Sequence, residues 1–163
     1  MTATETHTPA ESLQLVPLTR DEANRFIRAH HRHCGRVQAH RGAIGAELNG
    51  ELVGVAVIGN PPARLLATSD RFLVEITRLC TSPDAPRNTA SWLYARARRA
   101  ASALGFRRVT TVNLDAESGA SLRGAGFRIV GTVRRGRGWN RRQRPRGELA
   151  TDGIGKSRWE ANA

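Results

Sequence analysis

Residues 74–106 decide the fold of this 163-residue chain, and they read VEITRLCTSPDAPRNTASWLYARARRAASALGF. The strand predicted here starts upstream, as RFLVEITRLCT over residues 71–81, and residues 82–86 interrupt it. Apolar residues then recur at helical spacing from Asn88 to Leu104. A further strand over Arg108–Leu114 gives the order strand, helix, strand, which predicts a right-handed crossover between two parallel strands.

The residues before this segment predict a strand, a helix and a hairpin. LQLVPL alternates like a short strand that Pro17 ends. Thr19 and Glu22 form a capping box at the start of a helix over residues 20–31. Asn49-Gly50 is the dipeptide that favours a type I′ hairpin turn, and the arm after it, ELVGVAVIG, is apolar on both faces, as a central strand would be.

The C-terminal third predicts a short helix and two more strands. ESGASLRGAGF has the pattern of a short helix, Phe127–Val133 is the next strand, and Lys156–Ala161 is a last short strand. Residues 1–12 are polar and rich in threonine, so we expect a disordered tail. Residues 13–163 then form a single domain, which includes a basic loop at residues 134–146.

Positive charge is concentrated in one region of the chain. The sequence has 26 basic and 14 acidic residues, which give a formal charge of +12. Between Pro86 and Arg146 there are fifteen arginines and two acids, Asp115 and Glu117, so this stretch alone carries +13. Such clustering favours an anionic partner, and we expect a nucleic acid, either DNA or tRNA.

Composition excludes several other classes of protein. No apolar run approaches the roughly 18 residues that cross a bilayer, so we expect no membrane partner. Cys34 and Cys80 are the only cysteines, and the N-terminus lacks the basic start and apolar stretch of a secretory leader. These features predict a cytoplasmic location. The oligomeric state stays open, with a homodimer among the options.

Two parts of the sequence resemble the GNAT (Gcn5-related N-acetyltransferase) superfamily. VEITRLCT and the loop and helix after it are similar to that superfamily's cofactor-binding strand, pyrophosphate loop and following helix, which ends in a triplet like Leu104-Gly105-Phe106. ESGASLRGAGFRIVG is similar to its second signature. The chain from Leu13 to Trp159 also resembles small GNAT-like proteins of phages, plasmids and other mobile DNA, with Mom-like phage proteins that modify DNA as a further comparison. The resemblance implies an α/β fold with a GNAT-like mixed β-sheet flanked by helices on both faces.

The resemblance also implies acetyl-CoA or a related acyl-CoA as cofactor. Its pyrophosphate would lie at the start of the predicted helix, where backbone N–H groups point at an anion. The matching loop keeps Arg87, but Ala90 replaces the first glycine and Trp92 stands where a glycine or alanine is expected. The cofactor-binding residues that the resemblance implies are Leu79, Cys80, Thr81, Arg87, Asn88, Thr89, Ala90 and Ser91.

Acyl transfer to an amine needs a base for the amine and an acid for the leaving thiolate. The resemblance implies Glu75 as the base. Strict alternation along the strand would place Thr77 and Leu79 on the face of Glu75, and Arg78 and Cys80 on the other face. An ion pair of Glu75 with Arg78 or with another of the many arginines is the structural alternative. The Cys80 thiol is expected to pack as a buried hydrophobe.

Few residues qualify as the acid. Ser118 and Ser121 follow the strand that lines the cofactor in the superfamily, and each is also placed to cap a helix. Tyr94 falls within the predicted helix, where packing is the alternative role. Arg123 stands where many members of the superfamily carry a tyrosine that acts as the acid. His31 is a further candidate catalytic base, on the acceptor side.

Two clusters are expected on the acceptor side. HHRHC, residues 30–34, contains ligand types that zinc or iron favour, but its spacing matches no standard site, so we predict no metal. RRGRGWNRRQRPR, residues 134–146, combines seven arginines with one aromatic residue. That pattern suits phosphates and an unstacked base, and a solvated loop is the alternative. The residues predicted to contact nucleic acid or the acceptor are His33, Arg134, Arg135, Arg137, Trp139, Arg141, Arg142 and Arg144.

The leading hypothesis from the sequence is an acyl-CoA-dependent N-acyltransferase whose acceptor is a nucleic acid or nucleotide, as in DNA-base modification or a tRNA-linked reaction. Two rivals stay open. Trp92 and Arg123 motivate a degenerate GNAT fold that serves as a non-catalytic nucleic-acid-binding accessory protein. An acetyltransferase of a small anionic metabolite would instead bind coenzyme A without binding nucleic acid.

Overall fold

The computed structural model describes residues 12–31, 35–61, 69–133 and 154–163. Residues 1–11 of the predicted tail and the predicted basic loop lie outside these ranges. Seven strands of the described chain form one sheet in the order β1-β2-β3-β4-β5-β7-β6. Neighbouring strands are antiparallel except β4 and β5, which are parallel, as the predicted crossover requires. The strands are β1 (Gln14–Leu18), β2 (Gly42–Leu48), β3 (Glu51–Gly59), β4 (Leu73–Thr81), β5 (Arg108–Leu114), β6 (Arg128–Val133) and β7 (Lys156–Asn162).

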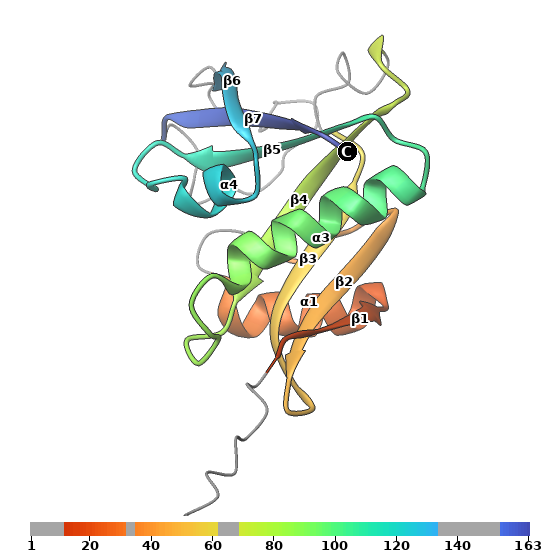
Figure 1. Ribbon diagram of the computed structural model, residues 1–163, viewed down its shortest axis with the longest axis vertical. Helices are drawn as coiled ribbons and strands as arrows, with labels where there is room; N and C mark the ends of the chain where they lie inside the picture. Colours follow the sequence, from red (N-terminus) through yellow and green to blue (C-terminus); the bar gives the residue numbers. More distant parts are fainter. Residues whose placement is uncertain (1–11, 32–34, 62–68, 134–153) are drawn as a thin grey trace, which may run out of the picture.

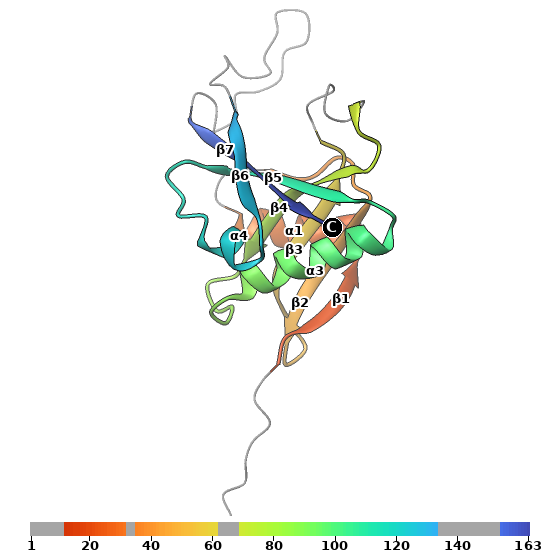
Figure 2. The same cartoon turned by 45° about the horizontal axis from the view of Figure 1, so that its top comes forward.

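Helices lie on both faces of the sheet (Figure 1). Helix α1 (Arg20–His30) packs on one face, over β2, β3 and β4. Helices α3 (Thr89–Ala103) and α4 (Ala120–Gly124) pack on the other face, and α4 lies beside the first turns of α3 (Figure 2). The predicted fold class, an α/β fold with a mixed sheet between helices, is confirmed.

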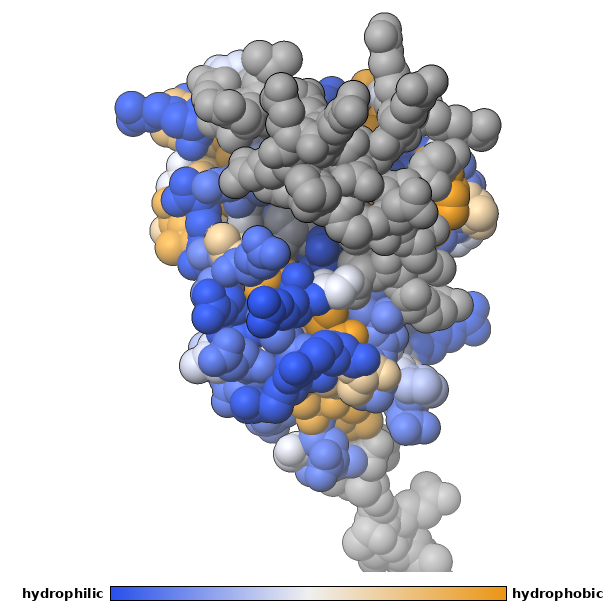
Figure 3. All heavy atoms as spheres, turned by 180° about the vertical axis from the view of Figure 1, so that it is seen from behind, coloured by the Kyte–Doolittle hydropathy of each residue, from blue (hydrophilic) through white to orange (hydrophobic). Residues whose placement is uncertain are grey.

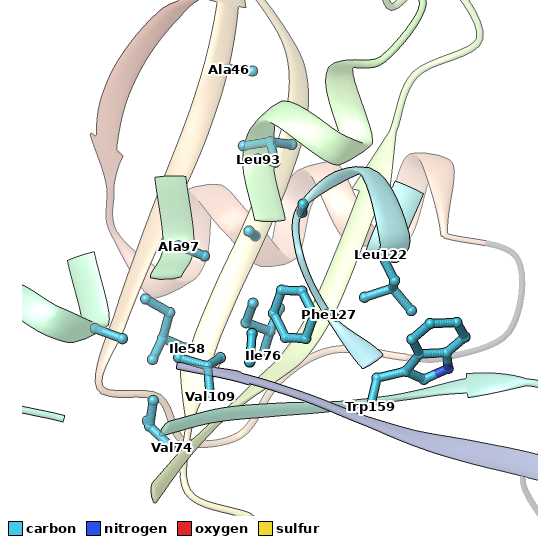
Figure 4. Packing of buried hydrophobic residues seen from close by; sticks show 14 of the residues in the cluster. Ala46, Ile58, Val74, Ile76, Leu93, Ala97, Val109, Leu122, Phe127 and Trp159 are labelled. Atoms are coloured by element: carbon cyan, nitrogen blue, oxygen red, sulfur yellow. The ribbon is translucent and has the colours of Figure 1, made fainter. Parts of the chain in front are cut away.

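Two apolar clusters hold the helices to the sheet. The larger lies under α3 and α4, where Leu93 and Ala97 of α3 pack with Ile76 and other strand residues (Figure 4). The smaller lies under α1, where Ile27 packs with Val57 of β3. Because β3 contributes buried side chains to both clusters, it is the doubly covered central strand that its sequence predicts.

Local sequence signals are confirmed at the hairpin and at the start of α1. Asn49 and Gly50 have φ values of 53° and 83°, as a type I′ turn requires. The Glu22 N–H donates to Thr19 Oγ1 at 3.3 Å, and the Thr19 N–H donates to the Glu22 carboxylate at 2.7 Å. Pro17 does not end β1, and the strand continues through it. An edge strand tolerates this because its outer side needs no N–H donor.

Strand β4 departs from strict alternation because a β-bulge inserts Thr77. In the ladder with β3, the residues on either side of Thr77 pair with consecutive residues, so Thr77 has no partner of its own. Arg78 therefore lies on the α1 face together with Glu75. The predicted faces were wrong beyond the bulge, since Leu79 packs in the α3 cluster and Cys80 in the α1 cluster.

Candidate functional site

Strands β4 and β5 pair only at their first residues. Leu73–Glu75 pair with Arg108–Thr110, and beyond this short ladder the strands diverge (Figure 1). The Thr111 hydroxyl still reaches across to donate to the Ile76 carbonyl at 2.9 Å. From Thr77 to Thr81, the β5-facing edge of β4 has no strand partner among the described strands. Such an unpaired backbone edge can bind the amide groups of an extended ligand.

Helix α3 begins beside the end of β4. Asn88 precedes it with a φ of 70°, and the Thr89 N–H and hydroxyl both donate to the Pro86 carbonyl, at 3.2 and 2.6 Å. Within the described ranges, the N–H groups of Ala90 and Ser91 have no acceptor, and the first turn carries no acidic side chain. The N-terminus of this 15-residue helix is therefore electrostatically and geometrically suited to an anion.

Close packing fixes the position of this first turn. A Cβ on Gly54 of β3 would lie 2.8 Å from Leu93 and 3.3 Å from Thr89, so the helix approaches the strand at a distance that favours glycine. On the other side, a Cβ on Gly124 of α4 would lie 2.7 Å from Ser91 Oγ. The Ser91 side chain thus faces α4, and its backbone N–H is the group that it can offer to a ligand.

Two residues that depart from the GNAT pattern have structural partners. Trp92 packs against the larger apolar cluster, and the Arg96 guanidinium lies 4.9 Å from its ring centroid. The Arg123 guanidinium lies 5.6 Å from the Trp159 ring and donates to the Ser118 carbonyl. Packing within the fold therefore accounts for both side chains.

Glu75 occupies the last rung of the β4–β5 ladder, opposite Thr110, on the α1 face. It is 8% exposed, and burial raises its pKa from 4.5 to about 7 in spite of the opposing effects of Arg78 and Arg158. The alternative ion pair with Arg78 is not formed among the described residues, because that guanidinium donates to two backbone carbonyls. A carboxyl that titrates near neutral pH is suited to act as a general base.

The predicted serine acids lie away from Glu75. The Ser118 hydroxyl accepts from the Ala120 N–H at 3.3 Å, although the N-cap of α4 is the next residue, Gly119. Ser121 lies within α4. Both serines follow the end of β5, whose last residue is four positions, or about 13 Å of strand, from the residue that pairs with Glu75.

Tyr94 has the packed role that its place in the helix favours. Its ring makes an edge contact with Phe127 at a centroid distance of 5.6 Å. Burial raises the pKa of Tyr94 to about 12, in spite of the opposing effect of the Thr111 side chain. The Thr111 hydroxyl donates to the Ile76 carbonyl, and this bond spans the point where β4 and β5 part.

The remaining predicted residues divide between described and undescribed parts of the chain. His31 is the C-cap of α1, and its backbone N–H donates to the Ile27 carbonyl at 2.8 Å. Cys80 is buried, and burial raises the pKa of its thiol to about 12, as expected of a packed hydrophobe. His33 and the predicted acceptor contacts from Arg134 to Arg144 lie outside the described residues.

The described residues contain neither a group of metal ligands nor a membrane-spanning helix. Among them, no three His, Cys, Asp or Glu side chains are grouped closely enough to hold a metal ion. Their helices are all too short or too polar to cross a membrane.

Many arginines of the basic region are used within the fold. Eight of the fifteen arginines between Pro86 and Arg146 are described, and the other seven lie in residues 134–146. Five of the eight contact aromatic rings, carboxylates or backbone carbonyls, which explains how the region tolerates so few acids. These five are Arg96, Arg98, Arg107, Arg108 and Arg123, while Arg87, Arg99 and Arg128 are exposed.

Sequence reasoning missed one residue of this site, Arg158 on β7. Alternation along KSRWEAN places Arg158 and Glu160 on the face opposite the buried Trp159, which is the face of Glu75. That alternation was readable in the sequence. The pairing of β7 with β5, which brings Arg158 near Glu75, was not.

The fold is the one shared by the GNAT acetyltransferases. An acetyltransferase from Bacillus subtilis in complex with CoA matches with a TM-score of 0.63 at 15% identity, over 93% of this chain and 99% of that chain. The ribosomal-protein-S18-alanine N-acetyltransferase from Escherichia coli matches with a TM-score of 0.64 at 8% identity, over 93% and 94% of the two chains.

A third solved structure shares the fold over a shorter part of its own chain. The GNAT superfamily phosphinothricin acetyltransferase from Sinorhizobium meliloti, in complex with AcCoA, matches with a TM-score of 0.55 at 21% identity, over 87% of this chain and 68% of that one. No protein-family model and no curated protein matches the sequence.

Proposed function

We propose that this protein is an acyl-CoA-dependent N-acyltransferase that uses acetyl-CoA and acts on an amine carried by a nucleic acid or nucleotide. The proposal has a donor half, which is the use of acetyl-CoA, and an acceptor half, which is the amine. One observation carries the donor half. The β4–β5 ladder ends at Glu75, and the strands then diverge beside a helix N-terminus that has unpaired N–H groups. The neighbours with this fold include structures in complex with CoA and AcCoA.

The described residues fit such a cofactor. The N–H groups of Ala90 and Ser91 and the exposed side chain of Arg87 would hold the pyrophosphate. The unpaired edge of β4 over Leu79–Thr81 would bind the amide groups of the pantetheine arm. Trp92 is compatible with cofactor binding at this site, because its ring packs against the apolar cluster and Arg96.

Glu75 is the residue proposed to act on the acceptor amine. When bound, acetyl-CoA supplies an acetyl thioester, which an uncharged amine can attack. At neutral pH a carboxyl with a pKa of about 7 is ionised in about half of the molecules, so Glu75 can take the proton that the amine must lose. Its place on the last rung puts this carboxylate at the point where the two strands begin to part.

The acceptor half rests on charge. Three exposed arginines of the basic region, Arg87, Arg99 and Arg128, join the seven in residues 134–146 as cations for phosphate contacts. DNA-base modification and acylation of a tRNA-linked amine are the two concrete forms of this proposal. The first form follows from the expectation, based on the sequence alone, that the chain resembles Mom-like proteins of phages and other mobile DNA.

Calorimetry with acetyl-CoA tests the donor half. We expect Arg87→Ala to weaken binding about tenfold or more, because a charge-assisted contact to phosphate is lost. Arg99→Ala is the matched control, since Arg99 is also exposed but lies in the third turn of α3, away from its N-terminus. If the wild-type protein gives no heat at high acetyl-CoA concentration, the donor half is wrong and the degenerate accessory protein is the better reading.

Binding assays at low salt test the acceptor half. We expect both the affinity for DNA or tRNA and its salt dependence to be large. With about five phosphate contacts, affinity should fall by roughly 4.5 powers of ten per decade of salt. Acetyl-CoA binding without any binding of DNA or tRNA would contradict this half and favour a small anionic acceptor.

A further inference from the structure

The α1 face of the sheet carries a group of charged side chains beyond the reach of α1. Helix α1 covers β2, β3 and β4, and no described helix covers β5, β7 and β6 on this side. Viewed from the α1 side, most of the described residues in the lower half of the molecule are hydrophilic, with apolar residues between them (Figure 3). Across the strands, Glu75, Thr110 and Glu160 form one row, because Thr110 pairs with both of the others. Arg158 lies one row further, paired with Val112.

Among the described residues, the Arg158 Nε–H group has no hydrogen-bond acceptor, although Glu160 lies within ion-pair distance. The Arg158 Nε atom is buried. The nearest acid, Glu160, lies 3.7 Å away and is also bonded by Arg108 at 3.1 Å. A buried donor without a hydrogen-bond partner is rare, so a native structure that keeps one calls for an explanation.

The surroundings of Arg158 are open enough for a ligand to supply that acceptor. Its side chain is 33% exposed, and the paired Val112 is 37% exposed, whereas Thr110 in the next row is fully buried. Solvent therefore reaches the row that contains Arg158 and Val112, whereas the row that contains Glu75 and Thr110 is buried. β4 and β7 are two strand spacings apart, about 10 Å, so side chains from the two strands can reach one small molecule.

Arg78 adds a second cation that is fixed in place. Its Nη1 donates to the Thr77 carbonyl at 2.6 Å and its Nε to the Gly35 carbonyl at 3.3 Å. The bulge at Thr77 directs this side chain to the same face as Glu75. Arg78, Arg158 and Glu75 thus share one face of the sheet, and both guanidinium groups act electrostatically on the Glu75 carboxyl.

We propose that Arg158, assisted by Arg78, forms a binding site for an anionic group of the acceptor, a phosphate or a carboxylate, beside the amine that Glu75 deprotonates. The planar guanidinium fork matches the paired oxygens of either group. The two carbonyl bonds that hold Arg78 in place limit the entropy that this side chain loses on binding. The proposal rests on the proposed function for its reaction, but anion binding by Arg158 can be tested without any turnover.

The test is a titration followed by NMR of the arginine side-chain Nε–H signals in the full chain. The Arg158 signal is assigned by its loss in Arg158→Lys. Two probes that differ only in the anionic group are compared, O-phosphoethanolamine and ethanolamine, with β-alanine as the carboxylate arm. We expect the Arg158 signal to shift with the anionic probes and not with ethanolamine. The anionic probe that binds more tightly shows whether the anionic group of the acceptor is a phosphate or a carboxylate.

Variants separate an anion site from a structural ion pair. In the variants, binding is followed by the Nε–H signal of Arg78, the second cation of the proposed site. Arg158→Lys should weaken binding of the anionic probe about 10- to 100-fold, because a lysine cannot reproduce the fork. Glu160→Gln removes the competing acid and should keep or strengthen binding, whereas Arg25→Lys, at an exposed position of α1, should change nothing. The proposal is overturned if ethanolamine shifts Arg158 equally, if no probe shifts it, or if Arg158→Lys binds as wild type does.

These outcomes are distinguishable from failure of the proposed function. Loss of acetyl-CoA binding in the calorimetric experiment would remove the transferase and leave the NMR result standing. The absence of any anion-dependent shift at Arg158 would remove this site and leave the transferase standing.

Discussion

Replacing Glu75 with glutamine should raise stability and lower activity at the same time. Burial raises the pKa of this carboxyl from 4.5 to about 7. Above neutral pH the folded protein must therefore hold a buried charge, whereas glutamine keeps the shape without the charge. A general base usually contributes 10²- to 10⁴-fold to a rate, so we expect Glu75→Gln to lose about that much in kcat/KM.

The magnitude follows from the difference in pKa between the unfolded and folded states. A carboxyl whose pKa is raised on folding costs nothing below about pH 4.5, where both states are protonated, and the folded state loses stability as pH rises toward 7. A difference of about 2.5 in pKa corresponds to about 3 kcal/mol. Glu75→Gln should therefore match wild type near pH 4.5 and exceed its free energy of unfolding by about 3 kcal/mol at pH 8.

Urea unfolding of both proteins at a series of pH values measures this difference. At pH 8 a gain of about 3 kcal/mol corresponds to a Tm higher by about 6–12 °C for a chain of this size. The wild-type pH–rate profile should rise with an apparent pKa near 7 and then level off. A stability difference that is independent of pH, or a variant less stable than wild type at pH 8, would refute the reasoning.

Three further substitutions test the packing that positions the site. Arg98→Met should lower the free energy of unfolding by about 2–3 kcal/mol, because two backbone carbonyls lose their donor, whereas the exposed Arg99→Met should change it by less than about 0.5 kcal/mol. Asn24→Ala removes both buried hydrogen bonds to the loop after α1 and should cost about 2–4 kcal/mol, read from chemical denaturation. Gly119→Ala should cost about 2–4 kcal/mol and shift the fluorescence of Trp159, because Gly119 has a φ of +65° and a Cβ there would lie 2.5 Å from the indole ring. An unchanged Trp159 spectrum and melting curve would contradict the last of these.

The elements of this fold could be predicted from the sequence wherever a local signal decides the structure. Asn49-Gly50 specifies its turn because both residues must take positive φ, and few other dipeptides do so easily. The apolar spacing of α3 likewise predicts a helix that the structure shows over Thr89–Ala103. Pro17 was misjudged because the cost of a proline depends on whether its strand lies at an edge, which is a property of the assembled sheet.

The candidate site was only partly predictable, for a related reason. Glu75, Arg87 and the loop before α3 are contiguous enough in sequence to be found by motif. Arg158 is 83 positions away from Glu75 in the chain, and only the order of strands brings the two together. The charge count also overstated the number of arginines that are left to bind an anionic partner. Aromatic faces and carbonyls serve as partners for arginines that have no acid nearby.

The bulge at Thr77 links the stability of the core to the chemistry of the site. In a regular strand, Arg78 would point into the cluster under α3, where an unpaired cation would be costly to bury, and Leu79 would point toward the Glu75 face. The inserted residue exchanges the two, so Leu79 fills the core and Arg78 lies beside Glu75. One extra residue in β4 therefore keeps the larger cluster apolar and also supplies a cation that favours ionisation of the candidate base. The site depends on this irregularity as much as on the identity of the residues that form it.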